Sequence, residues 1–167
     1  MKIKLFFFIS FFLFLACNSE NEEAIPSGFD TFYDLHGNDK NITTIGIPKF
    51  IFKMFVDIPN KEIEDAVDNI QTIDLMVIND PAEHLIGELY ALFPIKYYKP
   101  VLSVNNDDAK IKFFAKEKKE KVDEIIMVAQ QQAENNCAVL RLGGSFNLKT
   151  VENLAEKLDV RQIINYR

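Results

Sequence analysis

The sequence has few of the residues that usually carry catalysis or bind metals. Its two histidines, His36 and His84, have no partner at metal-ligand spacing, such as a second histidine four residues away. No serine lies in a nucleophile elbow, and Gly143-Gly144 lacks the lysine and the spacing of a phosphate-binding loop. We therefore expect no catalytic residue, no metal site and no cofactor, and we expect the two glycines to serve a bulge or a tight strand exit.

Basic residues are also in the minority. The chain holds 19 lysines and arginines against 25 acidic residues, which gives a formal charge of −6. Residues 1–16 carry two of the lysines and no acidic residue, so their removal lowers the charge to −8. A chain this acidic is not expected to bind nucleic acid or to dock electrostatically on anionic lipid.

The N-terminus has the three parts of a secretory signal peptide. Lys2 and Lys4 precede an apolar run over residues 5–15, and the small residue Ala16 and then Cys17 follow it. As a helix the run would extend about 16 Å, which is too short for a hydrocarbon core of about 30 Å. We therefore predict a signal peptide over residues 1–16 and not a transmembrane anchor.

The end of this signal, LFLAC at residues 13–17, resembles a bacterial lipobox. The cysteine of a lipobox is lipidated and becomes the new N-terminus, so the resemblance implies cleavage after Ala16 and lipidation of Cys17. Lipid chains contribute about 0.8 kcal/mol per buried methylene and would hold the mature protein on a membrane surface. The alternative is cleavage by the ordinary signal peptidase, which leaves Cys17 as a free thiol.

The segment after the signal, residues 17–41, is predicted to be the lipidated cysteine and a flexible acidic tether, because it is polar and shows little periodicity. Glu20, Glu22 and Glu23 resemble the export signals that send some Bacteroidetes lipoproteins to the outer face of the outer membrane. A plain solvated linker explains these residues equally well. The expected location is therefore the cell envelope, at the outer membrane, with the leaflet left open.

Residues 42–167 are long enough for a single domain with a sizeable core. Phe29, Phe32 and Tyr33, just before it, are too apolar for a free linker and are expected to pack on the domain. In its first half we expect a strand over residues 42–47, a helix capped by Asn60 with Ile63, Ala66, Val67 and Ile70 inward, a strand over residues 73–78, and a helix begun by Asp80, Pro81 and Glu83. Residues 50–55 stay open between strand and helix, because a short apolar run fits both.

The second half of the chain favours strands separated by polar turns. The expected strands cover residues 101–104, 110–116, 122–130 and 137–142, and a helix capped by Asn147 and a short strand over residues 161–165 follow them. Tight spacing favours an antiparallel meander, in which residues 125–128 are central because they are apolar on both faces. The predicted class is α+β: one mostly antiparallel sheet with helices packed on one face.

Several polar or reactive positions have a structural explanation beside a functional one. Cys137 lies in an apolar run, so we expect a buried structural thiol and not a nucleophile. Residues 105–108, NNDD, fit a hairpin turn better than a calcium loop, and residues 116–121 fit a charged hairpin tip. Tyr97 and Tyr98 point to opposite faces if they lie in a strand, so one of them is a candidate contact for a partner protein.

Four features together resemble a known family: the lipobox, the IPKFIFKM stretch at residues 47–54, the strand meander, and LGGSFNL at residues 142–148 before a helix. The family comprises Bacteroidetes lipoproteins of the DUF4252 type, catalogued as a domain of unknown function. The resemblance covers about residues 43–160 and implies an envelope lipoprotein with an α+β fold. It assigns no catalytic residue. Genes of its members often look like neighbours of alternative sigma-factor genes, so the resemblance implies a role in envelope-stress signalling.

The sequence therefore leaves three functional hypotheses. The first is a non-catalytic accessory module that is held on the membrane by lipid on Cys17 and binds another envelope protein. The second is an enzyme or a small-molecule binder whose site forms only in the folded chain, with convergent polar groups around a deep pocket. The third is a component of envelope-stress signalling linked to an alternative sigma factor.

Overall fold

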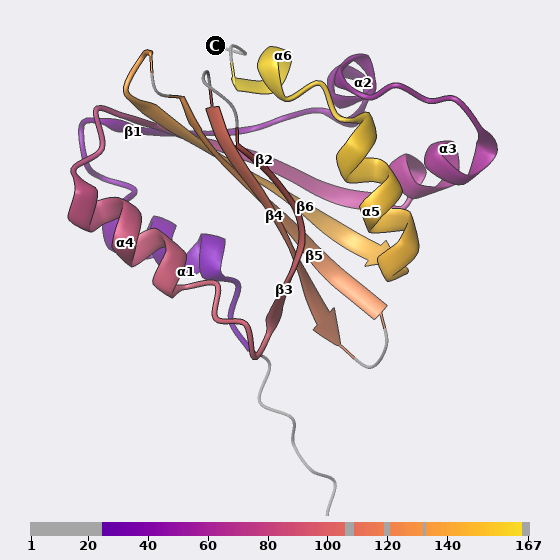
Figure 1. The fold of residues 1–167 in the computed structure, drawn as a ribbon, viewed down its shortest axis with the longest axis horizontal. Helices are drawn as coiled ribbons and strands as arrows, with labels where there is room; N and C mark the ends of the chain where they lie inside the picture. Colours follow the sequence, from indigo (N-terminus) through magenta and orange to yellow (C-terminus); the bar gives the residue numbers. More distant parts are fainter. Residues whose placement is uncertain (1–24, 106–108, 119–120, 132, 165–167) are drawn as a thin grey trace, which may run out of the picture.

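The computed structural model describes residues 25–105, 109–118, 121–131 and 133–164. The elements, in chain order, are α1 (Gly28–His36), β1 (Ile42–Gly46), α2 (Lys49–Phe52), the 3₁₀ helix η1 (Lys53–Phe55), α3 (Lys61–Asp68), β2 (Ile70–Asn79), α4 (Glu83–Ala91), β3 (Tyr98–Asn105), β4 (Ala109–Lys118), β5 (Lys121–Gln131), β6 (Asn136–Phe146), α5 (Leu148–Lys157) and α6 (Val160–Ile164). Figure 1 shows the strands as one twisted sheet with helices around it.

The sheet has six strands in the order β1-β2-β6-β5-β4-β3, and every pair is antiparallel. The last four strands follow one another as a meander, which confirms the predicted arrangement of the second half and the α+β class. Residues 125–128 lie in β5, which pairs with β4 on one side and β6 on the other. Their central place is therefore confirmed.

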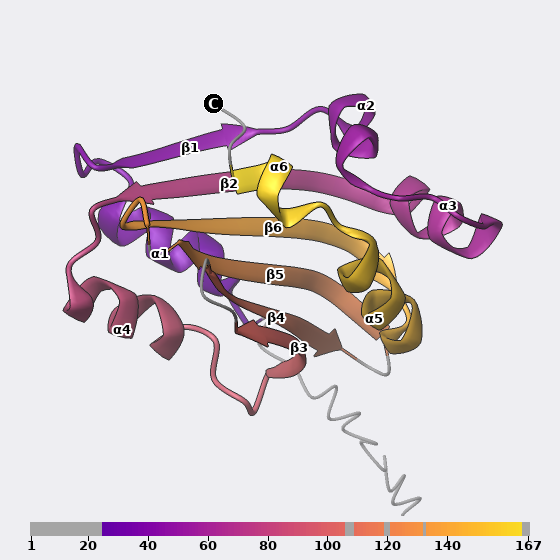
Figure 2. The same ribbon diagram turned by 45° about the horizontal axis from the view of Figure 1, so that its top comes forward.

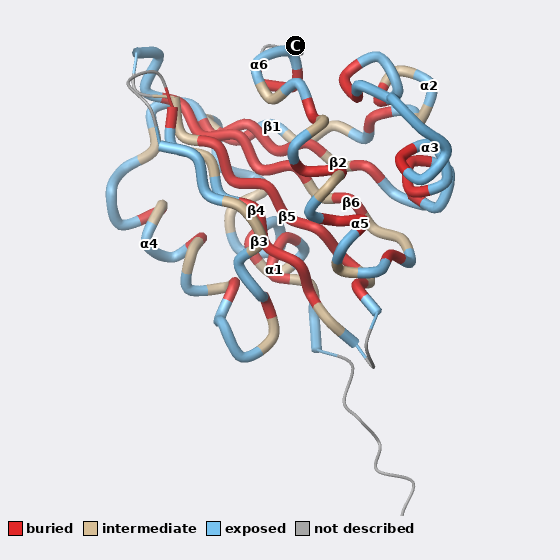
Figure 3. The backbone as a smooth tube through the Cα atoms, turned by 45° about the vertical axis from the view of Figure 1, so that its right-hand side comes forward, coloured by how far each residue is buried: buried red, intermediate tan, exposed pale blue. Residues whose placement is uncertain are grey.

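Helices cover both faces of the sheet, so the prediction of helices on one face is wrong. On one face Leu75, Leu140 and Met127 meet α2, α3, α5 and α6 in one apolar cluster. On the other face Ile126 and Val139 meet α1 and α4 in a second cluster. Figure 2 shows the two groups of helices on either side of the strands, and Figure 3 shows the buried residues concentrated in the sheet between them. A strand that is apolar on both faces needs cover on both faces, because either one left bare would expose apolar surface to water.

The folded part of the chain starts earlier than residue 42. Helix α1 lies within the segment predicted to be tether, and its Phe29 and Phe32 are buried in the second cluster as expected, whereas Tyr33 is exposed. Ser27 caps the helix, since its hydroxyl accepts a hydrogen bond from the Asp30 N–H. The domain boundary is therefore near Gly28, because two buried phenylalanines tie this segment to the sheet.

Two helix caps are confirmed. The Asn60 side chain accepts from the Ile63 N–H at 3.0 Å to start α3, and the Asn147 side chain accepts from the Thr150 N–H at 2.7 Å to start α5. Ile70, predicted in the first of these helices, is instead the first residue of β2.

The predicted capping role of Asp80 is wrong. Asp80 has a φ of 47° and forms a turn with Asn135, and its N–H donates to the Asn135 carbonyl at 2.9 Å. Helix α4 therefore begins after Ala82, which offers no side-chain cap. A hydrogen bond between Asp80 and Asn135, which are far apart in the chain, therefore takes the place of the predicted N-cap of the helix.

The last element is a helix and not the expected strand. The Asp159 carboxylate accepts from the Gln162 N–H at 3.1 Å and caps α6. The buried Ile163 and Ile164 then pack on the first cluster.

The two glycines of β6 stand opposite an irregularity of the sheet, as predicted. The register of β2 against β6 shifts where Ile70 and Thr72 pair with Gly144 and Gly143. A Cβ atom on Gly144 would lie 2.6 Å from the Asn69 carbonyl oxygen. The close approach of two backbones therefore requires glycine at this position.

Candidate protein-binding surface

Residues 49–55 form a short helical turn that exposes two large apolar side chains. Pro48 precedes it with extended backbone angles, and Phe52 and Phe55, three residues apart, turn inward to the first cluster. This spacing resolves the ambiguity of residues 50–55 in favour of helix. Phe50 and Met54, four residues apart, are left 70% and 71% exposed. We call these two side chains the α2–η1 patch.

Two lysines beside the patch are directed away from it. Lys49 Nζ donates to the Asp68 carbonyl oxygen and Lys53 Nζ to the Asp68 carboxylate, both at 2.8 Å. The hydrogen bond and charge of Lys53 lower the pKa of Asp68, and the pKa of Lys53 is raised in turn. These groups are solvent-exposed, so the pair contributes little stability. Its effect is to orient α2 against the end of α3 and to leave the apolar side chains uncovered.

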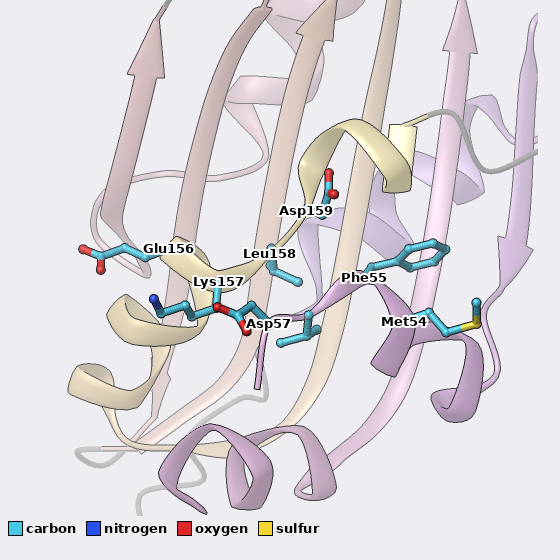
Figure 4. Close-up of a pocket in the computed structure, with 8 residues that line it drawn as sticks. Met54, Phe55, Asp57, Glu156, Lys157, Leu158 and Asp159 are labelled. Carbon is cyan, nitrogen blue, oxygen red and sulfur yellow. The ribbon is translucent and has the colours of Figure 1, made fainter. Parts of the chain in front are cut away.

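A depression of about 380 Å³ lies next to the patch. It forms where the chain after η1 meets the connection between α5 and α6, through a bridge that pairs Val56 with Leu158. The Asp57 N–H donates to the Lys157 carbonyl at 3.0 Å, and the Asp159 N–H donates to the Phe55 carbonyl at 2.7 Å. We call it the η1–α5 depression. Figure 4 shows Met54, Phe55 and Asp57 on one segment, and Glu156, Lys157, Leu158 and Asp159 on the other.

The floor of the η1–α5 depression is apolar and its rim is acidic. Val56 and Leu158 are nearly buried, whereas the carboxylates of Asp57, Glu156 and Asp159 are exposed around them. Asp159 is engaged by the cap of α6, but neither Asp57 nor Glu156 forms an ion pair with any residue that the structure describes. Lys157 is the one cation that lines the depression within this described part. Negative charge therefore predominates around an apolar floor.

A second polar group, on the opposite face of the sheet, holds the start of the folded chain. Lys116 Nζ donates to the Ile25 carbonyl at 2.7 Å. The Tyr98 hydroxyl accepts from the Gly28 N–H and donates to Glu124 Oε2, both at 2.8 Å. Ser27 donates to the same carboxylate. Burial and the Glu124 charge raise the pKa of Tyr98, so its hydroxyl keeps its proton and remains a donor.

Arg141 extends this polar group toward α1. Its Nε and Nη2 donate to Asp74 Oδ2 at 3.0 and 2.6 Å, and its Nη1 pairs with Asp30. The guanidinium also lies 4.8 Å from the centre of the Phe29 ring. Burial opposes the charge, but the hydrogen bonds and charge of Asp74 outweigh it and raise the pKa of Arg141. A depression of about 270 Å³ lies beside these groups. Because its main charges already bind one another and α1, we assign it a structural role.

Of the two tyrosines proposed as partner contacts, Tyr98 is 1% exposed and is occupied by Gly28 and Glu124. Its candidacy is therefore wrong, because a hydroxyl satisfied inside the fold leaves nothing for a partner. Tyr97 is half-buried against the second cluster, with Lys96 Nζ 4.9 Å from its ring centre. Its role as a contact stays a prediction. Ala16 and Cys17, the predicted cleavage and lipidation sites, lie outside the described residues.

The histidines and Cys137 lie apart from both groups. His36 is partly buried, with Nδ1 3.2 Å from Asp39 and Nε2 3.1 Å from Glu88, whereas His84 is exposed. No cluster of metal-ligating side chains occurs within the described ranges. Cys137 is buried as predicted, and burial raises the pKa of its thiol to about 12.

The turn between β3 and β4 belongs to a hairpin. The two strands pair as far as Asn105 and Lys110, which supports the turn interpretation over the calcium loop. Residues 106–108 themselves lie outside the described residues.

Sequence reasoning missed the residues that define the candidate surface. The exposure of Phe50 and Met54 follows from the helical spacing of Phe52 and Phe55, a signal that was present but ambiguous in so short a run. The acidic rim joins residues about 100 positions apart, and no local pattern marks them. Among the helices in the described part of the chain, none has the length and apolarity needed to cross a bilayer.

Comparison with known proteins identifies a family and nothing more specific. The model of the domain of unknown function DUF4252 matches residues 33–154, which include α2, η1, the whole sheet and most of α5. No curated protein and no solved structure matches the chain. Since the match covers well over half of the sequence, the chain belongs to the DUF4252 family.

Proposed function

We propose that the protein is a lipid-anchored lipoprotein of the bacterial cell envelope whose domain binds another protein and catalyses no reaction. The observation that carries the binding role is the α2–η1 patch. Phe50 and Met54 are exposed side by side on a segment that the fold holds firmly through Phe52 and Phe55. Large apolar side chains exposed together on a rigid element, next to a depression, are typical of protein contacts.

The anchor is proposed from the sequence, on the signal-like residues 1–16 and the lipobox-like cysteine at position 17. The fold offers a geometry that suits it. The chain enters the described structure at Ile25, which Lys116 of β4 holds on the α1 face of the sheet. The patch lies on the other face and next to β2, which stands three strand spacings, or about 14 Å, from β4. An anchor on one side therefore leaves the patch free for a partner.

The rival hypothesis of a small-molecule binder or an enzyme has less support. The polar depression beside Arg141 has the convergent charged groups that such a site needs. However, these charged groups are already used inside the fold. Lys116 donates to the Ile25 carbonyl, Glu124 accepts from Ser27 and Tyr98, and Arg141 donates to Asp74 and Asp30. Among the described residues that line the depression beside the patch, none is a nucleophile with a neighbouring base.

A site-specific crosslinking experiment tests the binding role. A photoreactive amino acid replaces Phe50 or Met54, one at a time, in the producing cells, and mass spectrometry identifies the adducts. Leu35, which is 67% exposed on α1, is the matched control because it lies on the other face of the sheet. We expect one discrete envelope partner at both patch positions and none at Leu35. No adduct, or the same adducts at Leu35, would contradict the proposal.

A second experiment tests the anchor. Cys17→Ala removes the proposed lipidation site, so the protein should leave the lipidated membrane fraction and the crosslinked partner should be lost or reduced. Metabolic labelling with a fatty acid gives an independent readout, since only the unsubstituted chain should carry label. Label that persists in Cys17→Ala would refute lipidation at this residue.

A role in envelope-stress signalling remains a separate proposal, which rests only on the family resemblance. Deletion of the gene should then change the transcript profile under envelope stress. An unchanged profile would remove this role and leave the binding proposal intact.

A further inference from the structure

The residues that line the η1–α5 depression indicate which kind of partner segment it binds. Its floor includes Val56 and Leu158, and Phe55 lines it from η1. Its volume of about 380 Å³ is near the lower end of the range of about 300–1,000 Å³ for small-molecule pockets, which suits the side chains of one short segment. The exposed Met54 forms its border with the α2–η1 patch. The patch and the depression are therefore continuous, and a protein segment bound to the patch can also contact the depression.

The charges around this floor are unbalanced. Asp57, Glu156 and Asp159 face the solvent at the rim, and among the described residues that line the depression Lys157 is the one cation. The nearest lysines of α2 and η1, Lys49 and Lys53, are directed to Asp68 and do not neutralise the rim. Asp57 and Glu156, which form no ion pair with any described residue, stand beside the apolar Val56 and Leu158 and favour an occupant that combines an apolar side chain with positive charge.

We propose that the η1–α5 depression receives a short segment of the partner protein in which an apolar residue is flanked by lysine or arginine. The apolar side chain lies over Val56 and Leu158, and the flanking cations lie beside Asp57 and Glu156. This inference rests on the proposed binding function and names the chemistry of the partner at the same surface.

The same charges argue against the other occupants. A bacterial membrane carries anionic headgroups, which three carboxylates at the rim would repel. Nucleic acid is disfavoured for the same reason, because its backbone demands a basic surface. A second copy of the chain would have to bring a basic apolar segment of its own. Among the described segments with such a pattern, Lys49 to Lys53 binds Asp68 through both of its lysines, and Lys110 to Lys112 lies inside β4, paired with β3 on one side and β5 on the other.

Synthetic peptides provide the test, with the lipidated full chain held in zwitterionic nanodiscs and amide chemical shifts as the readout. The probe is the peptide Lys-Lys-Leu-Lys-Lys. Glu-Glu-Leu-Glu-Glu reverses its charge, and Lys-Lys-Ser-Lys-Lys removes its apolar residue. A soluble short-chain phosphatidylglycerol is the lipid probe.

We expect the leucine-lysine probe to shift amides at residues 54–57 and 156–159, and both altered peptides to bind at least about fivefold more weakly. The double substitution Asp57→Asn with Glu156→Gln should weaken binding of the leucine-lysine peptide by about three- to tenfold. The effect is this small because each exposed ion pair contributes modestly. Glu83→Gln, an exposed carboxylate on α4, is the matched control and should leave binding unchanged.

Several results would overturn the inference. They are equal binding of the charge-reversed peptide, shifts confined to other surfaces, no effect of the double substitution, or shifts at the depression from the lipid alone. If crosslinks at Phe50 and Met54 identify a partner while the peptide fails to bind, the basic segment is wrong and the binding function stands. If the crosslinks also fail, the binding function itself is wrong.

Discussion

The hydroxyl of Tyr98 connects the start of α1 to the sheet, and Tyr98→Phe removes only that oxygen. It accepts from the Gly28 N–H and donates to Glu124, both at 2.8 Å, inside the protein. A neutral buried hydrogen bond contributes about 1 kcal/mol, and one to a charged group about 1.5–3 kcal/mol. The substitution also leaves the Gly28 N–H without its partner. We therefore expect a loss of about 2–3 kcal/mol in the free energy of unfolding.

Urea denaturation of the full-length chain measures this loss. At a slope of about 1–3 kcal/mol per molar urea, the midpoint should fall by roughly 1 M. Tyr97→Phe is the matched control, because Tyr97 is half-buried and its neighbouring contact is the solvent-side Lys96. It should change stability by less than about 0.5 kcal/mol. Amide hydrogen exchange at Gly28 should become faster in Tyr98→Phe alone. Equal stability losses, or unchanged exchange at Gly28, would show that the hydroxyl does not hold α1.

Three further predictions follow from local geometry. Asn147→Ala removes the cap of α5 and should cost about 1 kcal/mol in the same urea assay; no loss would mean that the cap is not formed. Gly144→Ala should destabilise by about 1–3 kcal/mol, because its Cβ would meet the Asn69 carbonyl oxygen at 2.6 Å, whereas Gly87→Ala, with open space in α4, should be neutral or stabilising; equal effects would refute the close approach. The Cys137 thiol, with a pKa of about 12 when folded against 9.0 for an ordinary thiol, should resist alkylation until urea unfolds the chain. Its contribution to stability should be full below pH 9 and decline as the pH rises from 9 toward 12, because the unfolded thiol ionises first; alkylation of the native protein at pH 8 would contradict this.

Local patterns were sufficient for most of the secondary structure. The caps at Asn60 and Asn147 and the strands of the meander were predicted because each depends on residues close together in the chain. The errors occurred where distant residues decide. Asp80 is drawn into a turn by Asn135, and the last apolar residues become a helix because Asp159 caps them.

The number of sheet faces covered by helices also depends on residues far apart in the chain. The apolar character of residues 125–128 on both faces placed β5 in the middle of the sheet, and the same observation implied cover on both faces. The segment that supplies part of the second cover, α1, was assigned to the tether because of its polar surroundings, although Phe29 and Phe32 were expected to pack on the domain. Burial of two aromatic rings outweighs such local polarity.

The sequence by itself determined the α+β class, the antiparallel meander, the family and the expectation of a lipidated Cys17, because each depends on local composition or on a short motif. Only the tertiary structure decided which apolar residues face solvent. Phe50 and Phe52 are chemically identical and two positions apart, and the fold buries the second and exposes the first. It also brought the chain at Val56 and Asp57 against Lys157 and Leu158, through one backbone bridge. Surfaces built from segments this distant arise only from packing, since no periodicity along the chain encodes them.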